Sequence, residues 1–110
     1  MISITIHKNS DKYTSLSCIG HAGFSEAGTD IVCAAASVLV INTLNAIEQL
    51  TDTHIEETAV SKKGQLMVQF PEGTAGGSTL LMDAMMMGLL EIERQYGRRY
   101  ITLDVKEVLS

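Results

Sequence analysis

The chain has 110 residues, of which 45% are hydrophobic, and its formal net charge is −5. This length fits one domain, which we expect to span residues 1–110, and the apolar content is enough for one core. An acidic chain without a basic stripe argues against a nucleic-acid surface, so we expect no direct nucleic-acid binding.

The sequence carries neither a leader nor a disulfide framework. Residues 1–6 alternate apolar and polar side chains and lack a basic leader, which excludes a secretory signal there. No uninterrupted apolar run approaches the roughly 20 residues needed to span a bilayer, so we expect no membrane association. The two cysteines, Cys18 and Cys33, are therefore expected to be reduced thiols in a cytoplasmic protein.

The first two predicted elements form a β-hairpin. Isoleucine alternates with polar residues over residues 2–6, which is typical of a strand with one buried face. Residues 8–12 have turn composition, and residues 13–20 predict a second strand. Cys18 has apolar neighbours on its face of that strand, so we interpret it as a small core residue.

A loop of small residues then leads into a long helix. Residues 22–28 offer little apolar bulk, which predicts a loop that can move. Thr29 suits the N-cap of the following helix, and Asp30 suits the positive end of its dipole. We predict this central helix over Ile31–Leu50. Its first half is apolar nearly all round, which indicates a sheet on one side and a second helix or a second subunit on the other.

The second half of the chain repeats the alternation of strands and helix. Residues 54–60 and 65–70 predict two strands joined by a turn that contains glycine. The glycine-rich segment 71–79 is a loop, residues 78–96 predict a second helix, and residues 100–105 predict a last strand. The order ββαββαβ predicts an α+β fold of two layers, with two helices on one face of a five-stranded mixed sheet.

A cysteine and a histidine border the loop of small residues. Cys33 lies in the first turns of the long helix, where unpaired N–H groups and the dipole favour a thiolate. His21 follows the second strand directly. An imidazole that removes the thiol proton and returns it to the leaving group is the minimum for thiol catalysis. The residues alone leave open whether His21 and Cys33 meet, because a cysteine in an apolar helix is usually a small hydrophobe.

Two polar neighbours of Cys33 each allow two interpretations. Asp30 and Ser37 lie at i−3 and i+4, and so share the face of Cys33. Asp30 either pairs with the helix dipole or orients His21 as a third member of the site. Ser37 either bonds the carbonyl of Cys33 or holds its thiol.

No metal or cofactor is expected. Two cysteines without a C-x-x-C spacing make a zinc site improbable, and segment 71–79 lacks the G-x-x-x-x-G-K-[ST] pattern of a phosphate loop. That segment is open to two interpretations, as one wall of a peptide groove or as a hinge.

The stretch Gly20–Ser37, G-H-A-G-F-S-E-A-G-T-D-I-V-C-A-A-A-S, closely resembles the signature of the ribosomal-processing cysteine protease (Prp) family. The element order and the length extend the resemblance over the whole chain. Ala36 stands where the family has valine, a change of volume that leaves the chemistry alone.

The resemblance implies a cytoplasmic bacterial endopeptidase that removes the N-terminal extension of a large-subunit ribosomal protein, cutting after an aromatic residue. Matched residue by residue, it makes Cys33 the nucleophile and His21 the base, with Asp30 and Ser37 in accessory positions. It also implies a homodimer, which agrees with the excess of apolar helix surface.

Three further hypotheses stand beside this function. A loop of Ala22, Gly23, Phe24 and Gly28 is expected to gate the site, ordering on substrate and bringing His21 to Cys33. The alternative to a protease is a non-catalytic ribosome-associated binding module that uses the same groove. A third class is a thiol redox enzyme or a small-molecule hydrolase.

Overall fold

The computed structural model describes residues 1–20, 27–60 and 65–107. Residues 21–26, 61–64 and 108–110 lie outside the described part, as do the side chains of residues 27–30 and 58–60. The element order is ββαββαβ, as the sequence predicts. The elements are β1 (Ile2–Asn9), β2 (Lys12–Ile19), α1 (Ala27–Leu50), β3 (Glu56–Val60), β4 (Leu66–Gln69), α2 (Gly77–Tyr96) and β5 (Ile101–Glu107).

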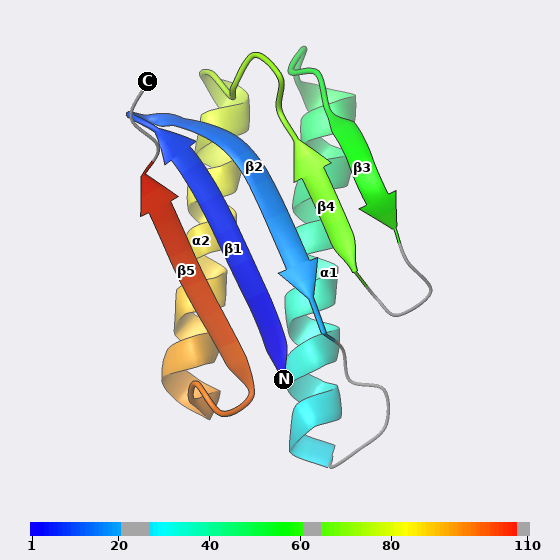
Figure 1. Cartoon of the computed structure of the whole chain (residues 1–110), viewed down its shortest axis with the longest axis vertical. Coiled ribbons are helices and arrows are strands. Elements are labelled where there is room, and N and C mark those ends of the chain that lie inside the picture. The colour runs from blue at the N-terminus through cyan, green and yellow to red at the C-terminus, as the bar shows by residue number, and fades with distance from the viewer. Residues whose placement is uncertain (21–26, 61–64, 108–110) are drawn as a thin grey trace.

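The five strands form one mixed sheet in the order β3-β4-β2-β1-β5 (Figure 1). The pairs β1–β2, β2–β4 and β3–β4 are antiparallel, whereas β1 and β5 are parallel. The predicted hairpin of the first two strands therefore forms the centre of the sheet. The chain runs from β4 to β5 through α2. Two strands that run parallel in one sheet need a crossover connection of this kind.

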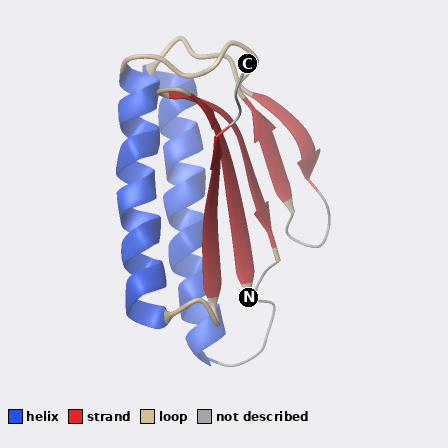
Figure 2. Cartoon of the chain, turned by 60° about the vertical axis from the view of Figure 1, so that its left-hand side comes forward, coloured by secondary structure: helices blue, strands red, loops and turns tan. Residues whose placement is uncertain are grey.

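Both helices pack on the same face of the sheet, and the other face is uncovered in the single chain (Figure 2). The isoleucines of β1 point to the helices and are at most 2% exposed, because strand side chains alternate between the faces. The predicted fold, with two helices on one face of a five-stranded mixed sheet, is confirmed. The largest buried side chains of this core are Phe70, Ile4, Ile6, Leu16, Ile47, Met82, Met85, Leu89 and Ile101.

Helix α1 is covered on two sides and exposed on a third. Its buried stripe faces the sheet, and α2 lies beside it, so close that a Cβ on Gly88 would lie 2.5 Å from Leu39 Cδ2. The outer side is exposed in the single chain, with Ile31, Val38 and Ile41 each more than half accessible. The sheet and α2 therefore cover only part of the apolar surface of α1.

Helix α1 is long and apolar, although no uninterrupted apolar run in the sequence approaches the length of a membrane span. Ile31–Leu50 is 20 residues long and contains an 18-residue stretch with a mean hydropathy of 1.7, enough to cross a membrane by length and composition alone. In the fold, however, Val32, Ala36 and Val40 are buried against the sheet. Long apolar helices of a protein core pass the same test of length and composition, so the test alone does not make α1 a membrane span.

Segment 71–79 is fixed by buried hydroxyl groups. Thr74 and Ser78 are fully buried, and Thr74 Oγ1 accepts the Tyr13 N–H at 3.0 Å. Ser78 Oγ lies 2.6 Å from the hydroxyl of a threonine that follows α1. The segment connects to the N-terminus of α2, at the end of the fold opposite Cys33 (Figure 1). It therefore does not form a wall beside the Cys33 of its own chain, and its interpretation as a hinge stays a prediction.

Candidate active site

Cys33 lies in the second turn of α1, level with the end of β2. Residues of an α-helix are about 100° apart around its axis, which places Cys33 within about 20° of Val40 and of Leu44. Both of those side chains are buried, whereas Cys33 is half-buried and packs against the same core. Cys33 thus stands at the solvent edge of the buried stripe, where a thiol can be reached from outside.

The start of α1 differs from the sequence prediction. Thr29 was expected as the N-cap and Gly28 as part of a gating loop, but α1 already begins at Ala27. Alanine is the best helix former, and one glycine costs only about 1 kcal/mol, so the helix extends through both residues. Gly28 is therefore helical, and assigning it to the loop was wrong.

The earlier start moves Cys33 away from the helix terminus. The unpaired N–H groups of a helix are its first four, here those of residues 27–30, and dipole effects fall off within that first turn. Asp30 is still in the first turn, although its side chain lies outside the described part. The N-terminus of the helix therefore stabilises a Cys33 thiolate less than the sequence analysis expects.

Cys18 is the core residue that the sequence predicts. It is 7% exposed, and its register neighbours are Ile4 on β1 and Leu66 on β4. Burial raises the pKa of the Cys18 thiol from its ordinary 9.0 to about 11, and the charge of the nearby Cys33 thiol adds to the shift. Cys18 is thus a protonated thiol at neutral pH, and the two cysteines do not form a disulfide.

Ser37 lies one turn after Cys33 and is also half-buried. With i to i+4 spacing the two residues are neighbours on one side of α1. The described residues do not decide between its two interpretations, which stay predictions.

His21, Ala22, Gly23 and Phe24 lie outside the described residues. Their predicted roles as base and as gate therefore stay predictions. The two other histidines of the chain are both described, and neither lies beside Cys33. His7 Nδ1 is 3.0 Å from Ser15 Oγ on the uncovered face of the sheet, and His54 pairs with Glu56 at 3.4 Å beyond the far end of α1.

Gly20 positions the chain just before His21, a role that the sequence analysis did not assign. Its φ of +92° is a conformation that residues with a Cβ rarely adopt, and a Cβ there would clash with the carbonyl oxygen of Met1. The sequence feature that could have indicated this role is the position of Gly20 between a strand and the candidate base His21. The end of β2 is therefore held against the start of β1.

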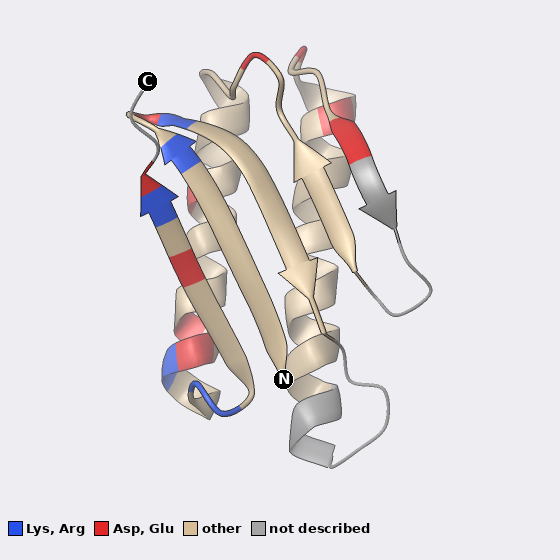
Figure 3. Cartoon of the chain, in the orientation of Figure 1, with Lys and Arg blue, Asp and Glu red and all other residues tan. Residues whose placement is uncertain are grey.

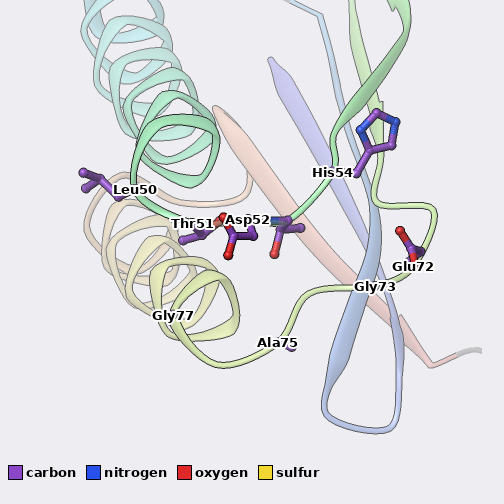
Figure 4. Close-up of a pocket in the computed structure, with 9 residues that line it drawn as sticks. Leu50, Thr51, Asp52, His54, Glu72, Gly73, Ala75 and Gly77 are labelled. Atoms are coloured by element: carbon purple, nitrogen blue, oxygen red, sulfur yellow. Dashed lines mark hydrogen bonds between the residues drawn. The ribbon is translucent and has the colours of Figure 1, made fainter.

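The described hollows lie away from Cys33. One, of about 490 Å³, lies between the C-terminus of α1 and the N-terminus of α2 and includes Asp52, His54 and Glu72 in its lining (Figure 4). Two others, of about 240 and 410 Å³, lie beside His7 on the uncovered face of the sheet. Within residues 1–20, 27–60 and 65–107, no group of three or more His, Cys, Asp or Glu could hold a metal ion.

Comparison with known proteins decides the family. Residues 1–102 match the family model described as cysteine protease Prp. The chain belongs to the Prp cysteine protease family. It is 33% identical over 101 residues to the ribosomal processing cysteine protease Prp of Bacillus subtilis (strain 168), an alignment that covers 87% of this chain and 90% of the relative.

Solved structures of the family share the fold. The Staphylococcus aureus ribosomal processing protease Prp in complex with a substrate peptide superposes with a TM-score of 0.86, at 30% identity over 96% of this chain and 100% of that one. The same protease with a covalently linked product peptide gives 0.83 at 31% identity, with the same coverage. The chain is accordingly a cysteine protease.

Proposed function

We propose that the chain is the endopeptidase that removes the N-terminal extension of a bacterial large-subunit ribosomal protein, with Cys33 as nucleophile and His21 as general base. One observation carries the proposal. The half-buried Cys33 on α1 lies at the same end of the fold as the C-terminus of β2, and the chain continues from that strand into His21. Family membership and the name of the Bacillus subtilis relative support the class of substrate.

His21 is the histidine that the fold leaves available for this role. The chain has three histidines, and the two described ones have partners far from Cys33. His21 follows Gly20 directly, so its Cα lies about 3.8 Å from that of Gly20. Gly20 in turn is held at the end of β2 that faces the N-terminal turns of α1 (Figure 1).

The reaction needs one proton to move twice. His21 removes the thiol proton, and Cys33 Sγ attacks the carbonyl carbon of the scissile bond. The imidazolium then gives its proton to the departing amine, which leaves an acyl-enzyme on Sγ. A water molecule, activated by the same imidazole, releases the new C-terminus and restores the thiol. Asp30 and Ser37, on the Cys33 side of α1, would orient the imidazole and the thiol.

The test is incubation of the full-length chain with the precursor of the large-subunit ribosomal protein, followed by mass spectrometry of the new N-terminus. One internal cut after an aromatic residue is expected with the wild type and none with Cys33→Ala. Binding of the precursor without any cut would instead favour the non-catalytic ribosome-associated module. Hydrolysis of small esters without cleavage of the precursor would favour a small-molecule hydrolase.

The site of action and the assembly follow from the same proposal. A ribosomal protein precursor is made and assembled in the cytoplasm, so we place the protease there.

We also propose a homodimer, because the outer faces of both helices are apolar and exposed. Figure 3 shows no charge on the described part of α1 before Glu48.

A further inference from the structure

The two cysteines lie at the same end of the core, one in each layer of the fold. Cys18 is the next-to-last residue of β2, points to the helix side of the sheet and is 7% exposed. Cys33 packs against the same buried cluster from the second turn of α1. Figure 1 shows the N-terminal turns of α1 at the level of the end of β2. The two thiols therefore approach this end of the core from opposite layers of the fold.

The two thiols differ in what can reach them. Cys33 is half-buried at the edge of the helix stripe, so a small solute can contact its sulfur. Cys18 is buried, and the pKa of its thiol is raised to about 11, so it meets no solute and forms little thiolate at neutral pH. The charge of a Cys33 thiolate adds to that shift of the Cys18 pKa, in keeping with the placement of both thiols at one end of the core. Cys18 can thus react with a group that Cys33 carries, and with little else.

We propose that Cys18 is a resolving cysteine, which closes a Cys18–Cys33 disulfide across the interface of α1 and β2 after a hydroperoxide has oxidised Cys33. In the first step the Cys33 thiolate attacks one oxygen of hydrogen peroxide, the O–O bond breaks, and a sulfenic acid and hydroxide form. In the second step Cys18 Sγ attacks Cys33 Sγ, the S–O bond breaks, and the hydroxyl group leaves as water with the Cys18 proton. The protein loses two electrons, which reduce the peroxide to water and hydroxide.

Closing this bond removes Cys33 from the substrate. A disulfide holds its two Cα atoms about 4.4–6.8 Å apart, so it draws the second turn of α1 toward β2. Cys33 Sγ then points into the core and can neither attack a peptide nor be oxidised to the irreversible sulfinic acid. A dithiol reductant reopens the bond by exchange at the Cys33 sulfur. The inference rests on the proposed reactivity of Cys33, but not on peptide cleavage.

The experiment compares the full-length wild type with Cys18→Ala and Cys33→Ala after brief treatment with hydrogen peroxide. Intact mass is measured without reductant and again after dithiothreitol. The wild type is expected to lose about 2 Da and both titratable thiols, and dithiothreitol should restore both. Cys18→Ala is expected to gain about 32 Da as sulfinic acid, which dithiothreitol does not reverse. Cys33→Ala is expected to keep its mass and its buried thiol.

A peptide map without reductant keeps the test independent of how the variants fold. A cross-linked peptide that joins Cys18 to Cys33 within one chain is expected from the oxidised wild type. Sulfinic acid at Cys33 in the wild type, formed as fast as in Cys18→Ala, would overturn the proposal. A Cys33–Cys33 link between two chains would overturn it as well. Because mass and thiol count are measured without substrate, a failed disulfide is distinguished from a failed protease function.

Discussion

At the scale of single residues, burial separates two chemically identical thiols. Cys18 lies inside the core, and burial raises its thiol pKa to about 11, whereas Cys33 stands at the edge of the same core. A thiol that is accessible and attached to a rigid helix suits a nucleophile, because its position does not depend on a loop. The partner that must reach it, His21, is attached to the end of β2.

We predict that Cys33→Ala and His21→Ala each abolish precursor cleavage while the fold is kept, and that Cys18→Ala leaves most of the activity. Nucleophile and base act as one unit, so the double variant should be little worse than either single variant. Single-turnover kinetics with the purified precursor measure this, and circular dichroism controls for the fold. A Cys33→Ala variant that still cuts the precursor would rule out the thiol mechanism.

The Cys18 thiol also predicts a pH dependence of stability. The unfolded chain releases this proton near pH 9, but the folded chain holds it until about pH 11. Between these values the unfolded state binds fewer protons, so the free energy of unfolding falls as the pH rises. A shift of this size corresponds to about 2–3 kcal/mol, fully present below pH 9 and lost by about pH 11.

Urea unfolding at pH 7, 9 and 10 measures this effect. The wild type should lose stability mainly between pH 9 and 10, and Cys18→Ala should lose less there, because the raised pKa has been removed. Tyr13, whose pKa is also raised by burial and by its bond to Asp83, contributes equally in both proteins above pH 10. Parallel curves for the two proteins would mean that Cys18 is not desolvated as the fold indicates.

The candidate site could be predicted from the sequence as far as residue types and spacing reach. Cys33 and its neighbour Ser37 share a helix face because they are four residues apart, and the buried place of Cys18 followed from strand alternation. The spacing could not give the placement of Cys18 and Cys33 at one end of the core. That placement depends on how α1 packs on the sheet, which is set by the whole core.

At the scale of elements, the connection from β2 to α1 depends on Gly20. The strand leaves the sheet there with a φ of +92°, and the missing Cβ makes room for the carbonyl oxygen of Met1. Backbone of β1 and backbone of β2 thus meet without a side chain between them. This close approach fixes the direction in which the chain continues to His21.

We predict that Gly20→Ala lowers both stability and cleavage. The positive φ alone costs about 1–3 kcal/mol, and the clash with Met1 adds to it, so the junction moves and His21 with it. Gly97→Ala is the matched control, since Gly97 has a φ of +95° but no atom within 4 Å of its Cβ position. Thermal unfolding of the two variants measures the strain that both share. Their cleavage rates show whether the site is displaced, which is expected for Gly20→Ala alone. Equal effects on cleavage in both variants would contradict the role of Gly20.

Strand alternation and helix period were enough to predict the elements, because the central strands have one apolar face and both helices are long. The boundaries were less predictable. The turn of α1 before Thr29 was missed, since Ala27 and Gly28 match loop composition as well as helix. The hydrogen bonds to hydroxyl groups that fix segment 71–79 join residues far apart in sequence, such as Tyr13 and Thr74. No local sequence pattern predicts them.

At the scale of the whole molecule, the helix layer has an inner face that is covered and an outer face that is not. Val38 on α1 is 68% exposed and Met87 on α2 is 74% exposed. Leu80 and Leu90 extend the same apolar character along α2. Apolar surface of this kind is costly in water, and self-association covers it on both copies at once.

We predict a homodimer that buries the outer faces of α1 and α2. Light scattering at micromolar concentration should give twice the mass of one chain for the wild type. Val38→Lys should give the monomer mass, because two-fold symmetry places the charge in the interface twice. Val105→Lys, on β5 and 49% exposed, is the control and should stay dimeric. Since the charge at position 38 lies far from the buried stripe of α1, the monomeric variant should keep its circular dichroism spectrum. A wild-type chain that scatters as a monomer would contradict the assembly, and the outer helix face would then be an apolar surface of the single chain.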